Sequence, residues 1–207
     1  MLMDYLRSNY KEGEPIFTDD IHIDGVNRPN LIQQLKTLSD NGKIIRIEKG
    51  IYYMPSKTRF GSSAGPAPET IARYKYISRN GKTDGYYSGN TFANMIGLST
   101  QVPMKKEIVS NNVAAIVKHI LIGQQAFILR KSNVPITNEN VRTLQLLELL
   151  KNLDDHIDID RNEAREKLTY FIDKNQITKK GVDQYIREYP DSTFRYYYEM
   201  RLDDVLT

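Results

Sequence analysis

The sequence predicts an α+β protein made of two domains, and three observations lead to this prediction. Short helical and strand-like segments alternate over roughly the first 133 residues, and the pattern after Pro135 is helical. Residues 57–68 are rich in Ser, Gly, Pro and Ala, a composition typical of a linker. We therefore expect a first domain at 1–56, a linker at 57–68, and a mixed α/β domain at 69–207 with a helical C-terminal part at 134–207.

Composition narrows the class of protein. Hydrophobic residues make up 40% and charged residues 27% of the chain, which is ordinary for a globular protein. No apolar run approaches the roughly 18 residues of a membrane span, and residues 1–7 do not resemble a secretory leader. Because the chain has no cysteine, disulfides, thiolate metal sites and cysteine nucleophiles are excluded. We expect a cytoplasmic protein that does not bind membranes.

Charge is unevenly distributed along the chain. Residues 1–133 contain 18 Lys and Arg against 11 Asp and Glu, a net +7, whereas residues 134–207 contain 11 against 15, a net −4. The segment 43–82 is the most basic, with nine Lys and Arg and two acids. Such clustering is typical of a surface that binds a polyanion, although a solvated basic face would have the same composition.

The first domain begins with two predicted helices. A helix at 1–10 places Met1, Tyr5 and Leu6 on one face. A short second helix follows Phe17, which we expect in the core, and Thr18 or Asp19 would cap it.

A third helix carries an apolar stripe formed by Leu31, Leu35 and Leu38. Asn27 or Arg28 would cap its start, Pro29 suits the first turn, and the pair Asn41–Gly42 ends it. Its other face is uncharged and polar, with Arg28 at the leading end and Lys36 alongside. The polar side chains are those of Asn30, Gln33, Gln34 and Thr37.

Two strands are predicted at 43–47 and 50–54, and Glu48–Lys49 separates them as in a hairpin. Three helices followed by such a hairpin match a winged helix-turn-helix. In that fold the third helix enters the major groove, where amides can donate to and accept from base edges, and the hairpin contacts the backbone. A protein-interaction module with an ordinary polar helix is the alternative.

The second domain is predicted to open with a helix at 69–79 that Asn80–Gly81 terminates. Residues 88–91 would cap a short helix that ends at Met95. Strands are expected at 106–110, 118–122 and 126–130, the last two joined by Gly123–Gln124. Further helices are expected at 138–151, 161–173, 179–189 and 192–202.

The helix at 138–151 is rich in leucine and should be buried on more than one side. Two interpretations of this helix remain open. It is either an internal core helix or the seam of a dimer.

The chain resembles the AbiEi-type antitoxins of type IV toxin–antitoxin, or abortive infection, systems. In the first domain, the resemblance rests on Phe17–Ile21, on Leu31–Leu38 of the third helix, on residues 41–46 and on Lys49–Pro55. In the second, it rests on residues 85–103, above all Leu98-Ser99-Thr100-Gln101-Val102-Pro103, and on residues 106–111. It covers about residues 15–131. The acidic helical region from 134 onward has no counterpart in it.

The resemblance implies a transcriptional repressor that regulates its own operon at an inverted repeat and counters a nucleotidyltransferase-type toxin. An inverted repeat would require a homodimer or two cooperating monomers. By this resemblance, the third helix and the hairpin supply the DNA contacts. Five basic residues of the second domain would extend the surface that contacts DNA. The expected DNA-binding residues are Arg28, Asn30, Gln33, Gln34, Thr37, Lys43, Arg46, Lys49, Arg73, Lys75, Arg79, Lys105 and Lys106. For Ser88–Gly89 and residues 100–103 we favour a purely structural role.

No pattern of an enzyme is found, and no cofactor or metal is expected. His22, His119 and His156 lack the spacing of a metal site, and the acidic run 154–160 lacks the glycine and closing glutamate of a calcium loop. Phosphate loops and nucleophile elbows are absent, and no Asp or Glu has Lys two positions later, as in a common nuclease pattern. A nucleic-acid-processing enzyme is therefore the least favoured alternative.

Overall fold

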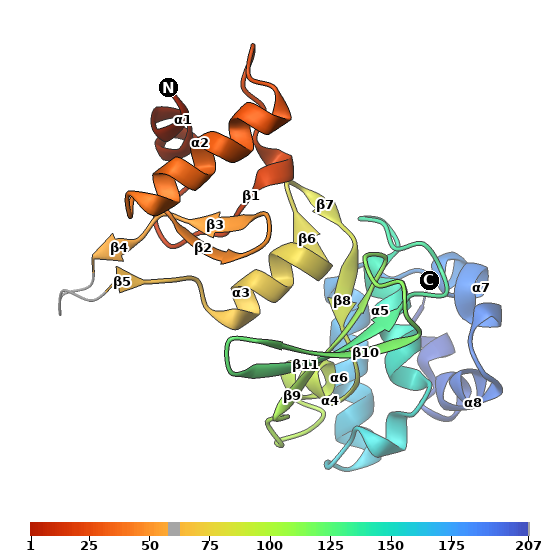
Figure 1. The fold of residues 1–207 in the computed structure, drawn as a ribbon. Helices are drawn as coiled ribbons and strands as arrows, with labels where there is room; N and C mark the ends of the chain where they lie inside the picture. Colours follow the sequence, from red (N-terminus) through yellow and green to blue (C-terminus); the bar gives the residue numbers. More distant parts are fainter. Residues whose placement is uncertain (58–62, 207) are drawn as a thin grey trace. The chain divides into compact units, whose positions relative to one another are not determined.

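The computed structural model describes residues 1–57 and 63–206, and it has a mixed α+β fold (Figure 1). The chain divides into two compact units, Met1–Ile71 and Ala72–Thr207. Within the described residues, no helix is long and apolar enough to cross a membrane.

The first unit has the element order of a winged helix-turn-helix. Its second helix is reduced to a single 3-10 turn, Thr18–Asp20, which follows directly on a short strand. Three strands form one antiparallel sheet in the order β1-β3-β2. Tyr52 on the central strand β3 pairs with Ile16 of β1 on one side and with Arg46 of β2 on the other. The elements are α1 (Leu2–Asn9), β1 (Ile16–Phe17), α2 (Arg28–Asp40), β2 (Ile45–Glu48), β3 (Ile51–Tyr53), β4 (Ser56–Lys57), β5 (Ser63–Ala64) and α3 (Pro68–Ala72).

The core of this unit lies between the helices and the sheet. Leu6, Leu35 and Ile44 are fully buried there, and Phe17 is 7% exposed, as predicted. The predicted linker at 57–68 begins in β4, which pairs with β5, and it ends where α3 begins. Arg59 of that segment lies outside the described residues.

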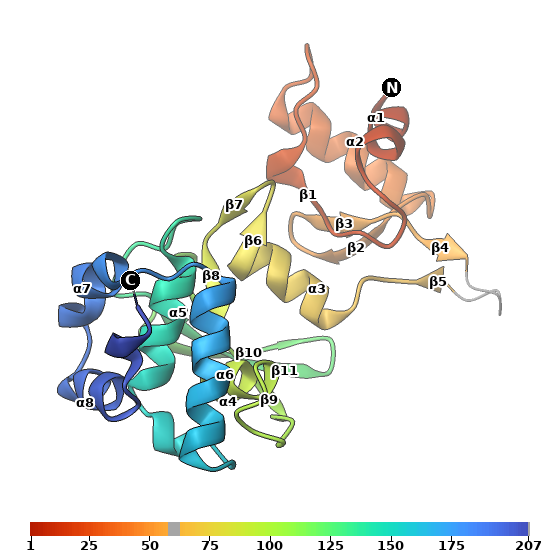
Figure 2. The same ribbon diagram turned by 180° about the vertical axis from the view of Figure 1, so that it is seen from behind.

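The second unit contains a four-stranded sheet in the order β10-β11-β9-β8. The hairpin of β10 and β11 turns at Gly123–Gln124, as predicted, whereas β11 runs parallel to β9. Helices α4 to α8 contribute to one core, and in Figure 2 α5 and α6 lie side by side with α7 and α8 beyond them. The elements are β6 (Ser78–Arg79), β7 (Lys82–Thr83), β8 (Gly85–Tyr87), α4 (Gly89–Met95), β9 (Lys105–Ser110), β10 (Val117–Ile122), β11 (Gln125–Lys131), α5 (Val141–Leu150), α6 (Arg161–Lys174), α7 (Lys179–Tyr185) and α8 (Asp191–Glu199).

The predicted helix at 69–79 is wrong at its C-terminal end. The chain leaves α3 through a π-helical segment, Arg73–Ile77, and Arg79 lies on strand β6, which pairs with β7. Asn80 and Gly81 form the turn of this hairpin, with φ angles of 52° and 76°. An Asn–Gly pair favours left-handed backbone equally after a helix and in a two-residue hairpin, so the sequence alone does not distinguish them.

The leucine-rich helix α5 belongs to the internal core. Leu144, Leu146, Leu147, Leu149 and Leu150 are all 0% exposed. The last four pack with side chains from α4, α6, α7 and α8 of the same unit, and Leu144 packs with Tyr86, Val109 and Ile136. Of the two interpretations left open by the sequence, the structure therefore supports an internal core helix.

Candidate nucleic-acid interface

Helix α2 presents a polar face because its apolar stripe is anchored in the first unit. Leu31 and Leu35 are buried at 6% and 0% exposed. Asn27 is the N-cap, and its Oδ1 accepts a hydrogen bond from the backbone N–H of Asn30 at 3.0 Å. This settles the predicted choice between Asn27 and Arg28.

The predicted amide face divides into exposed and partly covered positions. Asn30, Gln33 and Thr37 are exposed, whereas Gln34 is half-buried. The Thr37 hydroxyl donates to the Gln33 carbonyl at 3.0 Å, so it is already engaged with the helix backbone. The side chains of Asn30 and Gln33 therefore offer the most accessible donors and acceptors on this face.

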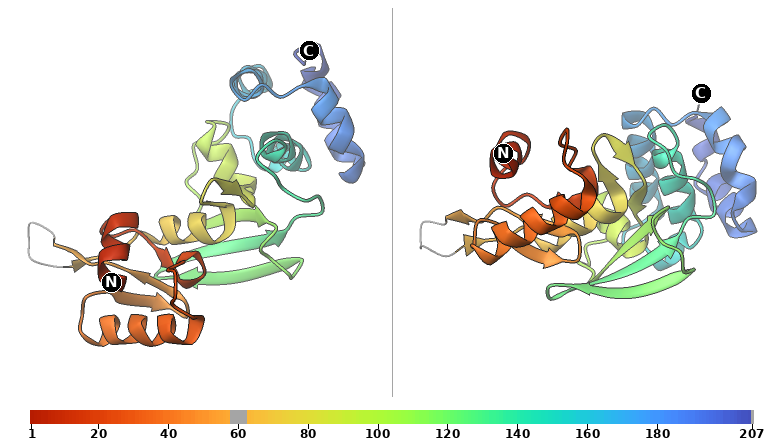
Figure 3. Two further views of the ribbon diagram at one scale, coloured as in Figure 1. Left: turned by 90° about the horizontal axis from the view of Figure 1, so that it is seen from above. Right: turned by 45° about the horizontal axis from the view of Figure 1, so that its top comes forward.

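The hairpin of β2 and β3 is fixed to the first unit at its turn. The backbone N–H and the hydroxyl of Thr18 both donate to the carbonyl of Gly50, at 2.9 and 3.1 Å. The register between the strands shifts between Arg46 and Glu48, a β-bulge of the kind that re-aims side chains. Figure 3 shows α2 beside this sheet in the left-hand view.

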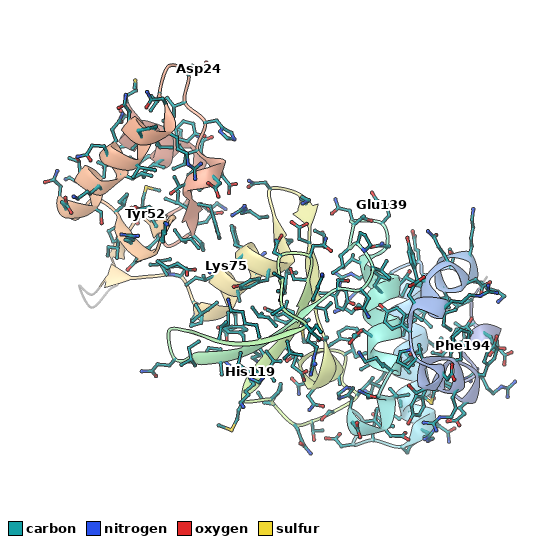
Figure 4. All side chains as sticks on the ribbon, turned by 45° about the vertical axis from the view of Figure 1, so that its right-hand side comes forward. Asp24, Tyr52, Lys75, His119, Glu139 and Phe194 are labelled. Atoms are coloured by element: carbon teal, nitrogen blue, oxygen red, sulfur yellow. The ribbon has the colours of Figure 1, made fainter. Side chains whose placement is uncertain are left out.

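A hollow of about 640 Å³ lies between α2 and the β2–β3 hairpin. Arg28, Ile32 and Lys36 line it from the helix, and Arg46 and Lys49 line it from the hairpin. Tyr52, labelled in Figure 4, lies at its inner wall on β3. The structure thus brings together three of the predicted contact residues, Arg28, Arg46 and Lys49.

The hollow is positively charged. Its four cations face two acids, Asp19 and Asp40, which leaves a net charge of +2. Arg28 forms an ion pair with Asp19 at 2.6 Å, and both side chains are about two-thirds exposed. Arg46 Nε donates to the Glu48 carbonyl at 3.2 Å. Phosphate oxygens are suitable partners for such a cluster, since Lys and Arg supply most backbone contacts to DNA.

Sequence reasoning did not select Ile32 or Lys36, although a signal was present. They follow Arg28 by four and eight residues, so a helix places all three on one side. The sequence places Lys36 beside the amides but gives it no role in binding. Ile32 is 49% exposed, so it adds an apolar side chain to this otherwise polar face of the helix.

Lys43 lies apart from this group. It lines a separate hollow with Arg7 and Lys11 of the first helical region, and this hollow does not include Arg46 or Lys49. The five remaining predicted contacts belong to the second unit. Arg73 and Lys105 are exposed, whereas Lys75, Arg79 and Lys106 are half-buried.

A model of a protein family of unknown function, DUF6088, matches residues 2–180. The chain belongs to this family. The match runs through the first unit and most of the second, and α8 lies beyond it. No curated protein matches the chain.

In this DUF6088 protein, a single carboxylate holds Ser99 and Thr100 of the segment 98–103. Asp158 accepts hydrogen bonds from the hydroxyls of Ser99 and Thr100 at 2.9 and 3.0 Å, and from the Thr100 N–H at 3.0 Å. Loss of hydration raises the pKa of Asp158, but the bonds from Ser99 and Thr100 together hold it below its usual range. These contacts agree with a structural role for Thr100, the first residue of the run 100–103.

At the start of α4, a residue far away in the sequence accepts the hydrogen bond expected of the predicted cap, Ser88. Ser88 occupies the N-cap position, but its buried hydroxyl has no hydrogen-bond partner among the described residues. Instead, Glu107 Oε1 accepts from the Asn90 N–H at 3.3 Å. A Cβ atom at position 89 would collide with that carboxylate, so Gly89 makes room for it.

The acidic run 154–160 serves internal contacts. Asp154 pairs with Arg161 at 2.7 Å and accepts from the Tyr196 hydroxyl at 2.6 Å. Asp160 caps α6 through the N–H groups of residues 162 and 163. Within the described part of the chain, no three His, Asp or Glu residues are grouped to hold a metal ion.

His119 and His156 belong to different segments of the second unit. His119 lies on the edge strand β10 (Figure 4). His156 is half-buried, and its Nδ1 lies 2.8 Å from Asn90 Oδ1. Burial lowers the pKa of His156.

Proposed function

We propose that this protein is a sequence-specific regulator that binds double-stranded DNA through its first unit. The hollow between α2 and the β2–β3 hairpin carries this proposal, because four cations line it beside an exposed amide face. Two kinds of contact are needed for specific binding, and both are available here. Cations neutralise phosphates, and amides read base edges.

Each residue has a defined part in this mechanism. Asn30 and Gln33 would contact base edges from α2 in the major groove, where an amide can form paired hydrogen bonds with adenine. Arg46 and Lys49 would bind backbone phosphates from the hairpin. Arg28 is already oriented by Asp19 at 2.6 Å, so it would reach the DNA in a restricted range of conformations.

The finer part of the proposal rests on the resemblance to AbiEi-type antitoxins. In this role the protein is a repressor that binds an inverted repeat upstream of its own operon and counters a nucleotidyltransferase-like toxin. Two copies would occupy such a site, as a homodimer or as cooperating monomers. Because α5 is enclosed within the second unit, another surface would join the copies.

Fluorescence anisotropy with labelled DNA from the upstream region tests the proposal. The protein should prefer the upstream DNA to shuffled DNA. Gln33→Ala combined with Arg46→Ala should weaken binding to the upstream DNA by about tenfold or more, and binding to shuffled DNA by less, because Arg46 contacts phosphates in both whereas Gln33 reads bases only in the first. Lys49→Ala should weaken binding to both DNAs equally and reduce the salt slope by about one unit.

Lys180→Ala on α7 is the matched control, because Lys180 is an exposed lysine of the second unit. It should leave both affinities unchanged. If the double variant binds its own region as tightly as the wild type at physiological salt, the assignment of α2 as the recognition helix is wrong.

A protein partner is the second candidate, and the exposed Ile32 favours it. An apolar side chain in the middle of a polar hollow suits a partner's apolar surface as well as a thymine methyl group. Co-expression with the product of the neighbouring gene distinguishes the two. A DNA-free complex of fixed stoichiometry that Ile32→Asp abolishes, without any DNA affinity of the free chain, would support this alternative.

A further inference from the structure

A second hollow, of about 560 Å³, lies in the second unit between α4, α5 and α6. Its volume falls in the range of small-molecule sites. It shares no lining residue with the hollow beside α2, which belongs to the first unit. The inference drawn from it therefore does not depend on DNA binding.

The inner wall of this hollow is aromatic and well packed. Phe92 of α4 and Phe171 of α6 meet edge to face with ring centroids 5.1 Å apart. At the rim, Met95 is 61% and Tyr170 66% exposed. Exposed large apolar side chains beside a concave, aromatic surface are typical of a site that covers an apolar ligand.

Arg142 is held in place by neutral groups. Its Nη1 donates to Gln145 Oε1 at 2.8 Å, and Gln145 Nε2 donates to the Tyr87 carbonyl at 2.8 Å. Gln145 is only 2% exposed, so the core fixes its amide. No carboxylate among the described residues forms an ion pair with Arg142. The guanidinium is therefore pre-positioned, with donors left for an anion.

Two lysines add positive charge on α6. Lys174 lies over the Tyr170 ring at 5.7 Å and has no ion pair with a described carboxylate. Lys167 pairs with Glu163 at 3.2 Å. Together with Glu166, the lining holds three cations and one acid, a net charge of +2. An anionic group is therefore the favoured polar part of a ligand.

We infer that this hollow binds a small organic anion that carries an aromatic ring. The ring contacts mainly the exposed side chains of Met95 and Tyr170, above a floor formed by Phe92 and Phe171, which are 2% and 7% exposed. The anionic group lies at Arg142 and Lys174. This hollow combines cations with an aromatic pair, whereas the α2 hollow has cations and no aromatic pair.

Two fluorescent probes test the inference. The first is 8-anilinonaphthalene-1-sulfonate, an aromatic sulfonate, and the second is N-phenyl-1-naphthylamine, which has the same rings without the charge. Arg142→Gln and Lys174→Gln should each weaken binding of the sulfonate by about tenfold or more, the loss expected for one charged hydrogen bond. Neither should change the affinity for the neutral probe by more than about twofold, because the rings keep the same apolar contacts.

Lys180→Gln is the control, since this exposed lysine lies outside the hollow. It should leave both affinities unchanged. In NMR spectra, the sulfonate should shift the side-chain amide signals of Gln145, and Arg142→Gln should reduce that shift.

If Lys180→Gln weakens sulfonate binding as much as Arg142→Gln and Lys174→Gln do, the inference is overturned, because the loss would then reflect only the change in net charge. So does unchanged sulfonate affinity in both Arg142→Gln and Lys174→Gln. If Arg142→Gln does not fold, Lys174→Gln alone decides, because Lys174 is an exposed side chain whose loss leaves the core intact.

Discussion

At the scale of single residues, Asp158 connects two segments that lie 58 residues apart in sequence. Its carboxylate accepts from Ser99 and Thr100, and its own N–H donates to the Leu98 carbonyl at 3.1 Å. The distinctive residues 98–101 are thus fixed in a turn after α4. The hydroxyls of Ser99 and Thr100 fix this turn only together with the carboxylate of Asp158.

Asp158→Asn should lower the melting temperature by a few degrees at neutral pH, because an amide cannot accept all of these hydrogen bonds. The folded-state pKa of Asp158 is below its ordinary value. Its contribution to stability is therefore complete above about pH 5 and is lost as the pH falls through the folded pKa. Thermal unfolding followed by circular dichroism should show the difference from wild type shrinking in acid.

Asp173→Asn provides the comparison, because Asp173 is exposed on α6. Its melting temperature should match that of the wild type throughout. A deficit of Asp158→Asn that persists unchanged to the most acidic condition would show that the charge does not matter.

Sequence reasoning at this scale succeeded where a local rule applies. Asn27 was identified as a possible cap because caps follow a short pattern. Glu107 was not, because its role at α4 depends on the pairing of β9 beside β8, which no local pattern encodes. For the same reason, the separation of Lys43 from Arg46 and Lys49 could not be predicted from their closeness in sequence.

At the scale of elements, α5 is the apolar centre of the second unit. Leu147→Ala should destabilise the protein by about 2–5 kcal/mol, because it leaves a cavity in a packed core. Urea denaturation with an unchanged m-value would measure this loss. Leu121→Ala, at a side chain 72% exposed on the edge strand β10, should change stability by no more than about 0.5 kcal/mol.

Sedimentation velocity on both variants addresses the rejected dimer interpretation of α5. Neither variant should change the mass of the DNA-free protein. Leu147→Ala with full stability but a lower mass would contradict the assignment of α5 to the internal core.

Elements were predicted best where periodicity and turn signals agree. The strands β9 to β11 and the helices α5 and α6 match their predicted ranges within a few residues. The second helix of the first domain was harder to predict, because a 3-10 turn of three residues has no periodic signal. The parallel pairing of β9 with β11 is also a tertiary feature that hydrophobic patterns cannot indicate.

At the scale of the whole molecule, the two units have separate hydrophobic cores. Leu35 belongs to the core of the first unit, whereas Leu147 belongs to that of the second. We expect Leu35→Ala to destabilise the first unit selectively, because local opening follows the loss of local packing.

Hydrogen exchange with mass spectrometry measures this selectivity. In Leu35→Ala, exchange should increase in peptides from α2 and β3 and remain unchanged in peptides from α5. Equal acceleration in both units would mean that the chain unfolds as one cooperative body.

The contact between Gly89 and Glu107 limits how this family can diverge. A side chain at position 89 would occupy the space of the Glu107 carboxylate, and a shorter residue at position 107 would leave the start of α4 without that acceptor. The two positions, 18 residues apart and on different elements, should therefore covary. Relatives that replace the glycine should also carry a smaller residue in place of the glutamate, together with a local serine, threonine or aspartate cap.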